Sequence, residues 1–98
     1  MPDLLITDIR FSAAPATDVA CGLLGWVSCV LNGSFHIDGI SLRRTVDDRL
    51  ALSFPARIDR TGQKHFFLRP LDDSARRETE HQIFTALGLV DAGWRRGG

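Results

Sequence analysis

The sequence predicts an α+β domain, in which an antiparallel β-meander of about five strands is followed by one C-terminal helix. Three observations predict it. Residues 4–54 contain segments with period-two alternation separated by turn residues. The pair Asn32-Gly33 is typical of a tight hairpin. Residues 75–87 contain no glycine or proline and carry apolar residues at helical spacing. A chain of 98 residues fits a single domain, which we place at residues 1–88, followed by a tail at 89–98.

The first three strands are predicted from alternation. Residues 4–11 form the first strand, with one face expected to hold Leu5, Thr7, Ile9 and Phe11 and the other Leu4, Ile6, Asp8 and Arg10. Residues 12–18 are expected to form a loop. Residues 22–31 are apolar on both faces, which indicates a strand covered on both sides. A type I′ turn at Asn32-Gly33 leads into a return strand at 34–43, where a change of parity predicts a bulge near Gly39.

The remaining elements are bounded by proline, glycine and aspartate. A strand at 49–54 ends at Pro55, and residues 57–63 form a hairpin tip that turns at Thr61-Gly62. The last strand covers 64–68. A helix begins at the capping cluster 72–74 and ends at Gly88. Its apolar stripe consists of Ala75, Thr79, Ile83, Phe84, Ala86 and Leu87.

Positive charge is concentrated in the middle of the chain, although the net charge is zero. Residues 43–69 hold seven basic and three acidic residues, a net charge of +4, whereas residues 1–42 have a net charge of −3 and residues 70–98 of −1. Eleven of the twelve basic residues are arginines, whose planar guanidinium can hold a phosphate in a bidentate manner. The alternative is that these arginines are solvated and pair with nearby aspartates.

The sequence contains no recognisable catalytic site, metal site or cofactor motif, so we expect a protein that is not an enzyme and has no small-molecule substrate. His36, His65 and His81 lie on three different predicted elements and match no metal-ligand spacing. Cys21 and Cys29 are expected to be buried, reduced thiols, with a redox role as the alternative.

No targeting or membrane-spanning segment is recognised, so a cytoplasmic protein without membrane association is expected. The sequence at 94–98, Trp-Arg-Arg-Gly-Gly, leaves three alternatives open. It is a plain tail with Trp94 folded back on the domain, an arginine-glycine RNA-binding segment, or a diglycine end like that of ubiquitin-like modifiers.

The hairpin at 57–64 is the best candidate for a binding site. A two-stranded ribbon with basic residues can follow a phosphate backbone or enter a major groove. Arg57, Arg60 and Lys64 are spaced so that a curled tip would present all three together. The alternative is an exposed loop that is kept soluble by its charge.

The order of these landmarks resembles that of SpoVG, the stage V sporulation protein G family of small bacterial proteins, over residues 4–88. The resemblance begins with the opening strand Ile-Thr-Asp-Ile-Arg at 6–10 and continues with Phe-His-Ile-Asp-Gly-Ile-Ser-Leu at 35–42. The segment Leu-Ala-Leu-Ser-Phe-Pro-Ala-Arg at 50–57 follows, then Gly62, the segment Pro-Leu-Asp at 70–72, and Arg76.

The resemblance implies a homodimer that pairs strands between subunits, and a non-catalytic septation and sporulation regulator that binds DNA and also RNA. Carried over to this chain, the implied nucleic-acid-binding residues are Arg57, Arg60, Lys64, Arg69 and Arg76. Ile58 and Asp59 dilute the charge of the hairpin tip relative to the family. The alternative is therefore a protein-interaction module that has the SpoVG-like fold and does not bind nucleic acid.

Overall fold

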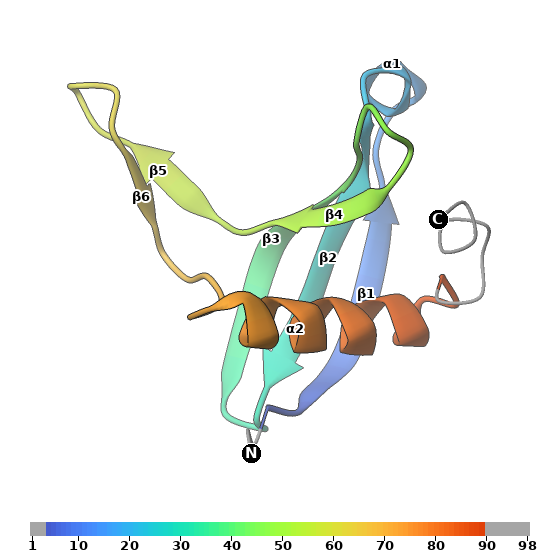
Figure 1. The fold of residues 1–98 in the computed structure, drawn as a ribbon, viewed down its shortest axis with the longest axis vertical. Helices are drawn as coiled ribbons and strands as arrows, with labels where there is room; N and C mark the ends of the chain where they lie inside the picture. Colours follow the sequence, from blue (N-terminus) through green and yellow to red (C-terminus); the bar gives the residue numbers. More distant parts are fainter. Residues whose placement is uncertain (1–3, 90–98) are drawn as a thin grey trace.

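The computed structural model describes residues 4–89, which form an antiparallel sheet, a separate hairpin and a C-terminal helix (Figure 1). The elements in chain order are β1 (Ile6–Ala13), α1 (Ala16–Ala20), β2 (Leu23–Leu31), β3 (Phe35–Arg44), β4 (Leu50–Ser53), β5 (Ala56–Ile58), β6 (Lys64–Phe66) and α2 (Asp73–Ala86). Strands β1 to β4 pair in chain order, whereas β5 and β6 pair only with each other. The predicted α+β class with a C-terminal helix is confirmed, and the predicted meander of about five strands is corrected to four strands plus a hairpin.

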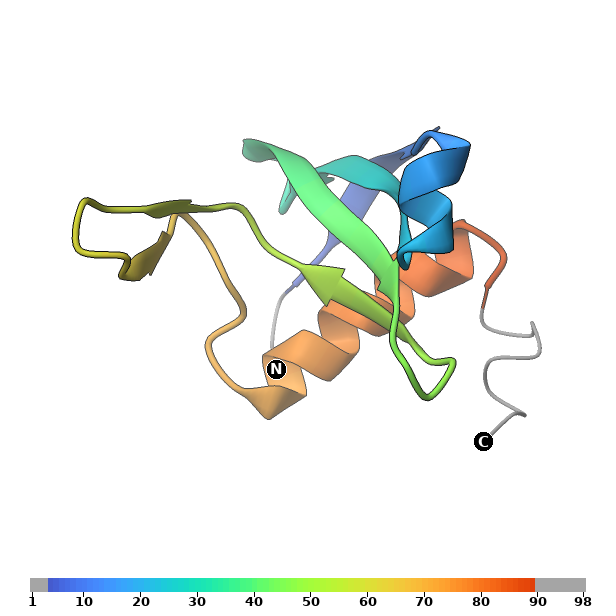
Figure 2. The ribbon, with the colours of Figure 1, turned by 90° about the horizontal axis from the view of Figure 1, so that it is seen from above.

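The chain leaves the sheet after β4, at Phe54 and Pro55. Proline has no N–H group, so it cannot continue a ladder of backbone hydrogen bonds. The carbonyl of Pro55 instead accepts a 2.9 Å hydrogen bond from the N–H of Phe67, which closes the base of the hairpin. We call residues 55–69 the arm, and Figures 1 and 2 show it projecting away from the sheet and α2.

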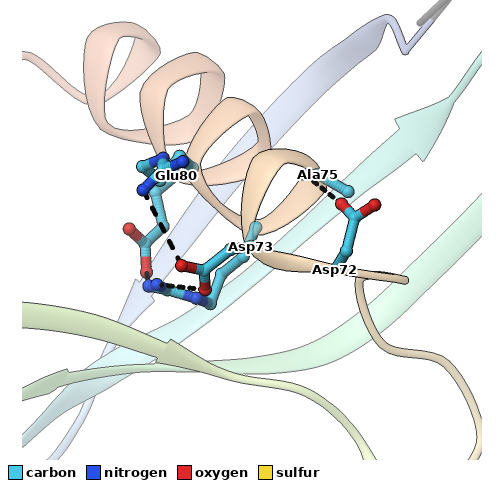
Figure 3. Close-up of polar contacts among 6 residues, drawn as sticks. Asp72, Asp73, Ala75 and Glu80 are labelled. Carbon is cyan, nitrogen blue, oxygen red and sulfur yellow. Dashed lines mark hydrogen bonds and ion pairs between the residues drawn. The ribbon is translucent and has the colours of Figure 1, made fainter.

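Helix α2 begins and ends at the predicted residues. The carboxylate of Asp72 accepts a 2.9 Å hydrogen bond from the N–H of Ala75 and caps the first turn (Figure 3). At the other end Gly88 adopts a positive φ of 76°, and the N–H of Leu89 donates to the carbonyl of Phe84 at 2.8 Å. This is the Schellman arrangement, which satisfies the last free carbonyls of a helix.

The core lies between α2 and one face of the four-stranded sheet (Figure 2). The predicted helical stripe is confirmed at its centre, where Thr79, Ile83 and Phe84 are buried, whereas Ala86 is exposed. The buried cluster consists of Ile6, Val27, Cys29, Ile37, Ile40, Leu42, Ile83 and Phe84. Leu50, Leu52 and Phe54 pack at its margin, as the alternation of the fourth strand predicts.

The prediction for the faces of the first strand is wrong. Asp8 adopts a positive φ of 52°, and the register of β1 against β2 shifts between Thr7 and Arg10. This bulge inserts one extra residue, so Ile6 and Ile9 both contact the core although they are three residues apart. Leu5, which was expected to share a face with Ile9, is exposed instead.

The two predictions about β2 and β3 are confirmed. Asn32 and Gly33 have φ values of 50° and 66°, and the N–H of Ser34 donates to the carbonyl of Leu31 at 2.9 Å. Positive φ at both central residues is the mark of a type I′ turn. The register of β2 against β3 shifts between Val27 and Cys29, opposite Gly39, where the bulge was predicted.

Three smaller expectations are corrected. The segment 12–18, predicted as a loop, contains the end of β1 and the start of α1. The last strand ends at residue 66 rather than 68. Cys29 is buried as expected, but Cys21 is exposed after α1, and both thiols are free.

The alternatives for residues 94–98 lie outside the described residues. Within residues 4–89, no helix is long and apolar enough to cross a membrane.

Candidate nucleic-acid interface

The basic side chains divide into those held in ion pairs and those that are not. The paired arginines lie at the end of β3, in the β3–β4 turn and on α2, and their shortest nitrogen–oxygen distances are Arg44–Asp48 3.5 Å, Arg49–Asp47 3.6 Å, Arg76–Asp73 2.9 Å and Arg77–Asp73 3.7 Å. Within the described part of the chain, ion-pair partners are lacking for Arg10, Arg43, Arg57, Arg60, Lys64 and Arg69. Four of the five predicted binding residues therefore lie on the arm with unpaired charges.

The register of the hairpin separates two of these cations. Arg57 pairs with His65, and Ile58 pairs with Lys64. Because neighbouring residues of a strand point to opposite faces, Arg57 and Lys64 project from opposite faces of the ribbon. The expectation that the tip presents Arg57, Arg60 and Lys64 together is thus wrong for Arg57 and Lys64.

The tip is organised by Asp59. One carboxylate oxygen accepts hydrogen bonds from the N–H and hydroxyl of Thr61 at 2.9 and 2.7 Å and from the N–H of Gln63 at 3.0 Å. The other carboxylate oxygen lies 2.7 Å from Nε2 of His65. These hydrogen bonds, with that from Thr61 the strongest, lower the pKa of Asp59 to about 2. The carboxylate is therefore bound by its own loop.

The turn of the arm lies one residue earlier than predicted. The N–H of Gly62 donates to the carbonyl of Asp59 at 3.0 Å, so the central residues are Arg60 and Thr61 rather than Thr61 and Gly62. Arg60 consequently occupies the exposed tip of the arm.

Two arm cations converge on the ring of Phe66. Nζ of Lys64 lies 5.4 Å from the ring centroid, and Cζ of Arg69 lies 5.5 Å from it. A cation within about 6 Å of an aromatic ring is attracted by the negative ring face. Phe66 therefore contacts two unpaired cations, a role that was not predicted from the sequence although Lys64 and Phe66 share a strand face by their spacing.

A hollow of about 450 Å³ separates the base of the arm from the start of α2. Its lining includes Lys64, Phe66, Arg69 and Arg76, so the structure brings three of the five predicted residues together. Arg57 and Arg60 lie outside this hollow, Arg60 at the tip of the arm and Arg57 on the ribbon face opposite to that of Lys64.

Arg76 differs from the other predicted residues because two carboxylates hold its guanidinium. It donates to Asp73 at 2.9 Å and to Glu80 at 3.3 Å (Figure 3). The hydrogen bond with Asp73, reinforced by the charge of Glu80, raises the pKa of Arg76, and the same hydrogen bond lowers the pKa of Asp73. Arg76 is the least available of the predicted phosphate ligands, and its spacing of three and four residues from the two acids indicates this pairing.

The three histidines lie on three different elements. His36 is on β3, His65 on β6 and His81 on α2. Across residues 4–89, no three histidine, cysteine or acidic side chains are grouped so as to hold a metal ion. Burial raises the pKa of the Cys29 thiol, and the nearby charge of Asp38 adds to the effect.

Comparison with protein-family models and with curated proteins found no match to this chain.

Proposed function

We propose that this protein is a SpoVG-like, non-catalytic regulator that binds nucleic acid through its arm and acts as a homodimer. The observation that carries the proposal is the charge of the arm. The arm contains four basic residues and one aspartate, a net charge of +3, and the basic residues are Arg57, Arg60, Lys64 and Arg69. None of these four cations has an ion-pair partner among residues 4–89. Unpaired cations on a projecting element can neutralise phosphates without first breaking an internal salt bridge.

The shape of the arm supports contact with a nucleic-acid backbone. A two-stranded ribbon fits the major groove of duplex DNA. Arg57 and Lys64 project from opposite faces of the ribbon, so each can reach the phosphate backbone on its own side of the groove. Arg60 at the tip of the ribbon is then free to contact a third phosphate.

Removing the arm cations is expected to weaken nucleic-acid binding. In the triple variant Arg57→Ala/Arg60→Ala/Lys64→Ala, we expect affinity for a duplex at low salt to fall by about 10-fold or more, because three phosphate contacts are lost. Fluorescence anisotropy with a labelled duplex measures the change.

The chain offers a matched control for this variant. Arg44→Ala/Arg49→Ala/Arg77→Ala removes the same charge from three ion-paired surface residues, and surface pairs contribute little to stability. We expect this control to bind nearly as well as the wild type. Equal losses in the two triple variants would mean that net charge, and not the arm, determines binding.

The exposed apolar residues of the arm support the proposed homodimer. Ile58 is 61% exposed and Phe67 is 68% exposed. An isolated two-stranded hairpin is marginally stable in water, and its strand edges are free to pair. We propose that the arms of two copies pair and cover these side chains.

Light scattering with size-exclusion chromatography tests the dimer. The wild type is expected to elute with the mass of a dimer, and Ile58→Ser/Phe67→Ser is expected to shift it toward the monomer. Val46→Ser is the control, because Val46 is fully exposed in the β3–β4 turn, away from the arm. A wild type that stays monomeric at high concentration would contradict the proposal.

The same exposed side chains favour a second candidate function, a protein-interaction module. Leu71, beside the base of the arm, is 93% exposed and adds to the apolar surface. A partner protein that is captured by the wild type, lost with Ile58→Ser/Phe67→Ser and retained after nuclease treatment would favour this candidate over nucleic-acid binding.

A further inference from the structure

The face of the sheet that points away from α2 contains the other two unpaired cations. Val27 and Cys29 are buried against the core, so the alternating residues Trp26 and Ser28 point to the opposite face. Arg10 pairs with Ser28 and shares this face. On β3, Ser41 pairs with Trp26, and Arg43 lies two residues further along the same face. The expectation that β2 is covered on both faces is only partly met, since Trp26 is 37% exposed.

Strands β1 and β3 both bulge beside the same point of β2. Asp8 and Ile9 on β1 stand opposite Cys29, and Asp38 and Gly39 on β3 stand opposite Ser28. Bulges bend a strand and redirect its side chains, and they are over-represented next to functional sites. Here the two bulges flank a shallow hollow of about 350 Å³ on the exposed face. Its lining includes Arg10, Ser12, Trp26, Ser28, Asp38 and Gly39.

Trp26 lines this hollow and has small cross-strand neighbours on both sides. Its cross-strand partners are Ser12 on β1 and Ser41 on β3. Arg10 and Arg43 occupy the two diagonal positions, one toward each end of β2, which are within reach of long side chains. An exposed aromatic ring thus lies between two unpaired guanidinium groups along a diagonal of the sheet.

We propose that this hollow binds a base of a single-stranded nucleic acid. The base stacks on Trp26, while Arg10 and Arg43 contact the phosphates that precede and follow it. The edge of a base presents both donors and acceptors, which Asp38 and the Ser28 hydroxyl can meet. In a duplex the base faces are covered by their neighbours, so the site selects single strands. The inference shares its class of ligand with the proposed function but rests on other residues.

Charge distinguishes this ligand from a second copy of the chain. Pairing two such faces around Trp26 would bring four unpaired guanidinium groups into one interface, where like charges repel. A polyanion instead neutralises them. His36 and Asp38 also border this face, 3.0 Å apart, so the single carboxylate of the hollow has a partner of its own.

The fluorescence of Trp26 tests the proposal directly. The chain contains two tryptophans, so Trp94→Phe leaves Trp26 as the reporter. A short single-stranded oligothymidylate is titrated into this variant, and a duplex of the same length is titrated in parallel. We expect saturable quenching by the single strand, weakened by salt, and little quenching by the duplex. Absence of quenching by the single strand would overturn the proposal. A signal that changes with protein concentration and not with oligonucleotide concentration would also overturn it.

Substitutions separate this site from the arm. Trp26→Ala is expected to lower single-strand affinity by about 5- to 150-fold, the range for losing one stacked base, and Trp26→Phe to retain most of it. Arg10→Gln/Arg43→Gln should weaken single-strand binding more than Arg44→Gln/Arg49→Gln, whose side chains are ion-paired. The arm variant Arg57→Ala/Arg60→Ala/Lys64→Ala should keep the quenching of Trp26 by the single strand. Its duplex affinity tests the proposed arm function separately, and duplex affinity equal to that of the wild type would contradict only the arm function. Equal single-strand affinity of Trp26→Ala and the wild type would overturn the sheet-face site alone.

Discussion

Replacing Phe84 with alanine is expected to lower the free energy of unfolding by about 3 to 5 kcal/mol, the range for a fully buried phenylalanine. Phe84 is only 2% exposed and packs at the centre of the cluster that joins α2 to the sheet. The loss combines the transfer free energy of the ring with the cavity that it leaves. A domain of this size has a total stability of about 5 to 15 kcal/mol, so the expected loss is a large fraction of the stability of the fold.

Urea denaturation followed by circular dichroism measures this loss. Phe35→Ala is the matched control, because it makes the same chemical change at a ring that is 71% exposed near the β2–β3 turn. We expect the control to lose no more than about 1 kcal/mol. Similar losses in the two variants would mean that α2 does not anchor the fold.

Gly25→Ala is expected to cost about 3 kcal/mol or more, although it adds only one methyl group. Gly25 is buried in β2, paired with Ala13 on one side and Leu42 on the other. A Cβ at this position would overlap the carbonyl oxygen of Ser12 and the ring of Phe11. Overpacking a core costs about 1 to 3 kcal/mol when side chains can move, and a backbone carbonyl in a paired strand moves less easily.

Thermal unfolding checks the prediction for Gly25. In a domain of this size, 1 kcal/mol corresponds to a change of about 4 to 8 °C in Tm. Adding Phe11→Ala removes the overlap with the ring but not with the carbonyl, so the double variant should recover only part of the loss. A single Gly25→Ala variant within about 0.5 kcal/mol of the wild type would show that β1 and β2 are not held this closely.

Local sequence patterns predicted the elements whose geometry depends on neighbouring residues. Asn32 and Gly33 both tolerate positive φ, so the tight turn follows from that pair alone. The parity change between Ile37 and Ile40 predicted the bulge at Gly39, because each apolar side chain has to face the core. The cap at Asp72 likewise depends on side chains within one helical turn.

The features that were missed depend on where the chain goes in space. The bulge of β1 lies at Asp8, and an aspartate with positive φ is indistinguishable by pattern from one in a regular strand. Helix α1, at Ala16–Ala20, is too short to show a helical period. The hairpin of β5 and β6 has strand-like sequence, and only its departure at Pro55 separates it from the sheet.

The sequence predicted which segment forms a basic hairpin but not how the cations of that hairpin are arranged. Composition identified the basic hairpin, and the structure places Arg57, Arg60, Lys64 and Arg69 there. Which cations are paired depends on carboxylates that the fold brings near, so among the five predicted residues the ion pairing could be foreseen only for Arg76, whose partners lie on its own helix. The cations of the sheet face, Arg10 and Arg43, are 33 positions apart in the sequence. They lie on the same face of the sheet only because β1 and β3 both pair with β2.

We propose that the arm neutralises nucleic-acid phosphates, so the affinity is expected to depend on the salt concentration. For duplex DNA, log K falls with log salt concentration with a slope of about −0.9 for each phosphate contacted. We predict that Arg57→Ala/Arg60→Ala/Lys64→Ala makes this slope shallower by about 2.7, three times that value, whereas Arg44→Ala/Arg49→Ala/Arg77→Ala leaves it unchanged. Absence of binding by the wild type at low salt, or the same slope in the wild type and the arm variant, would contradict the claim.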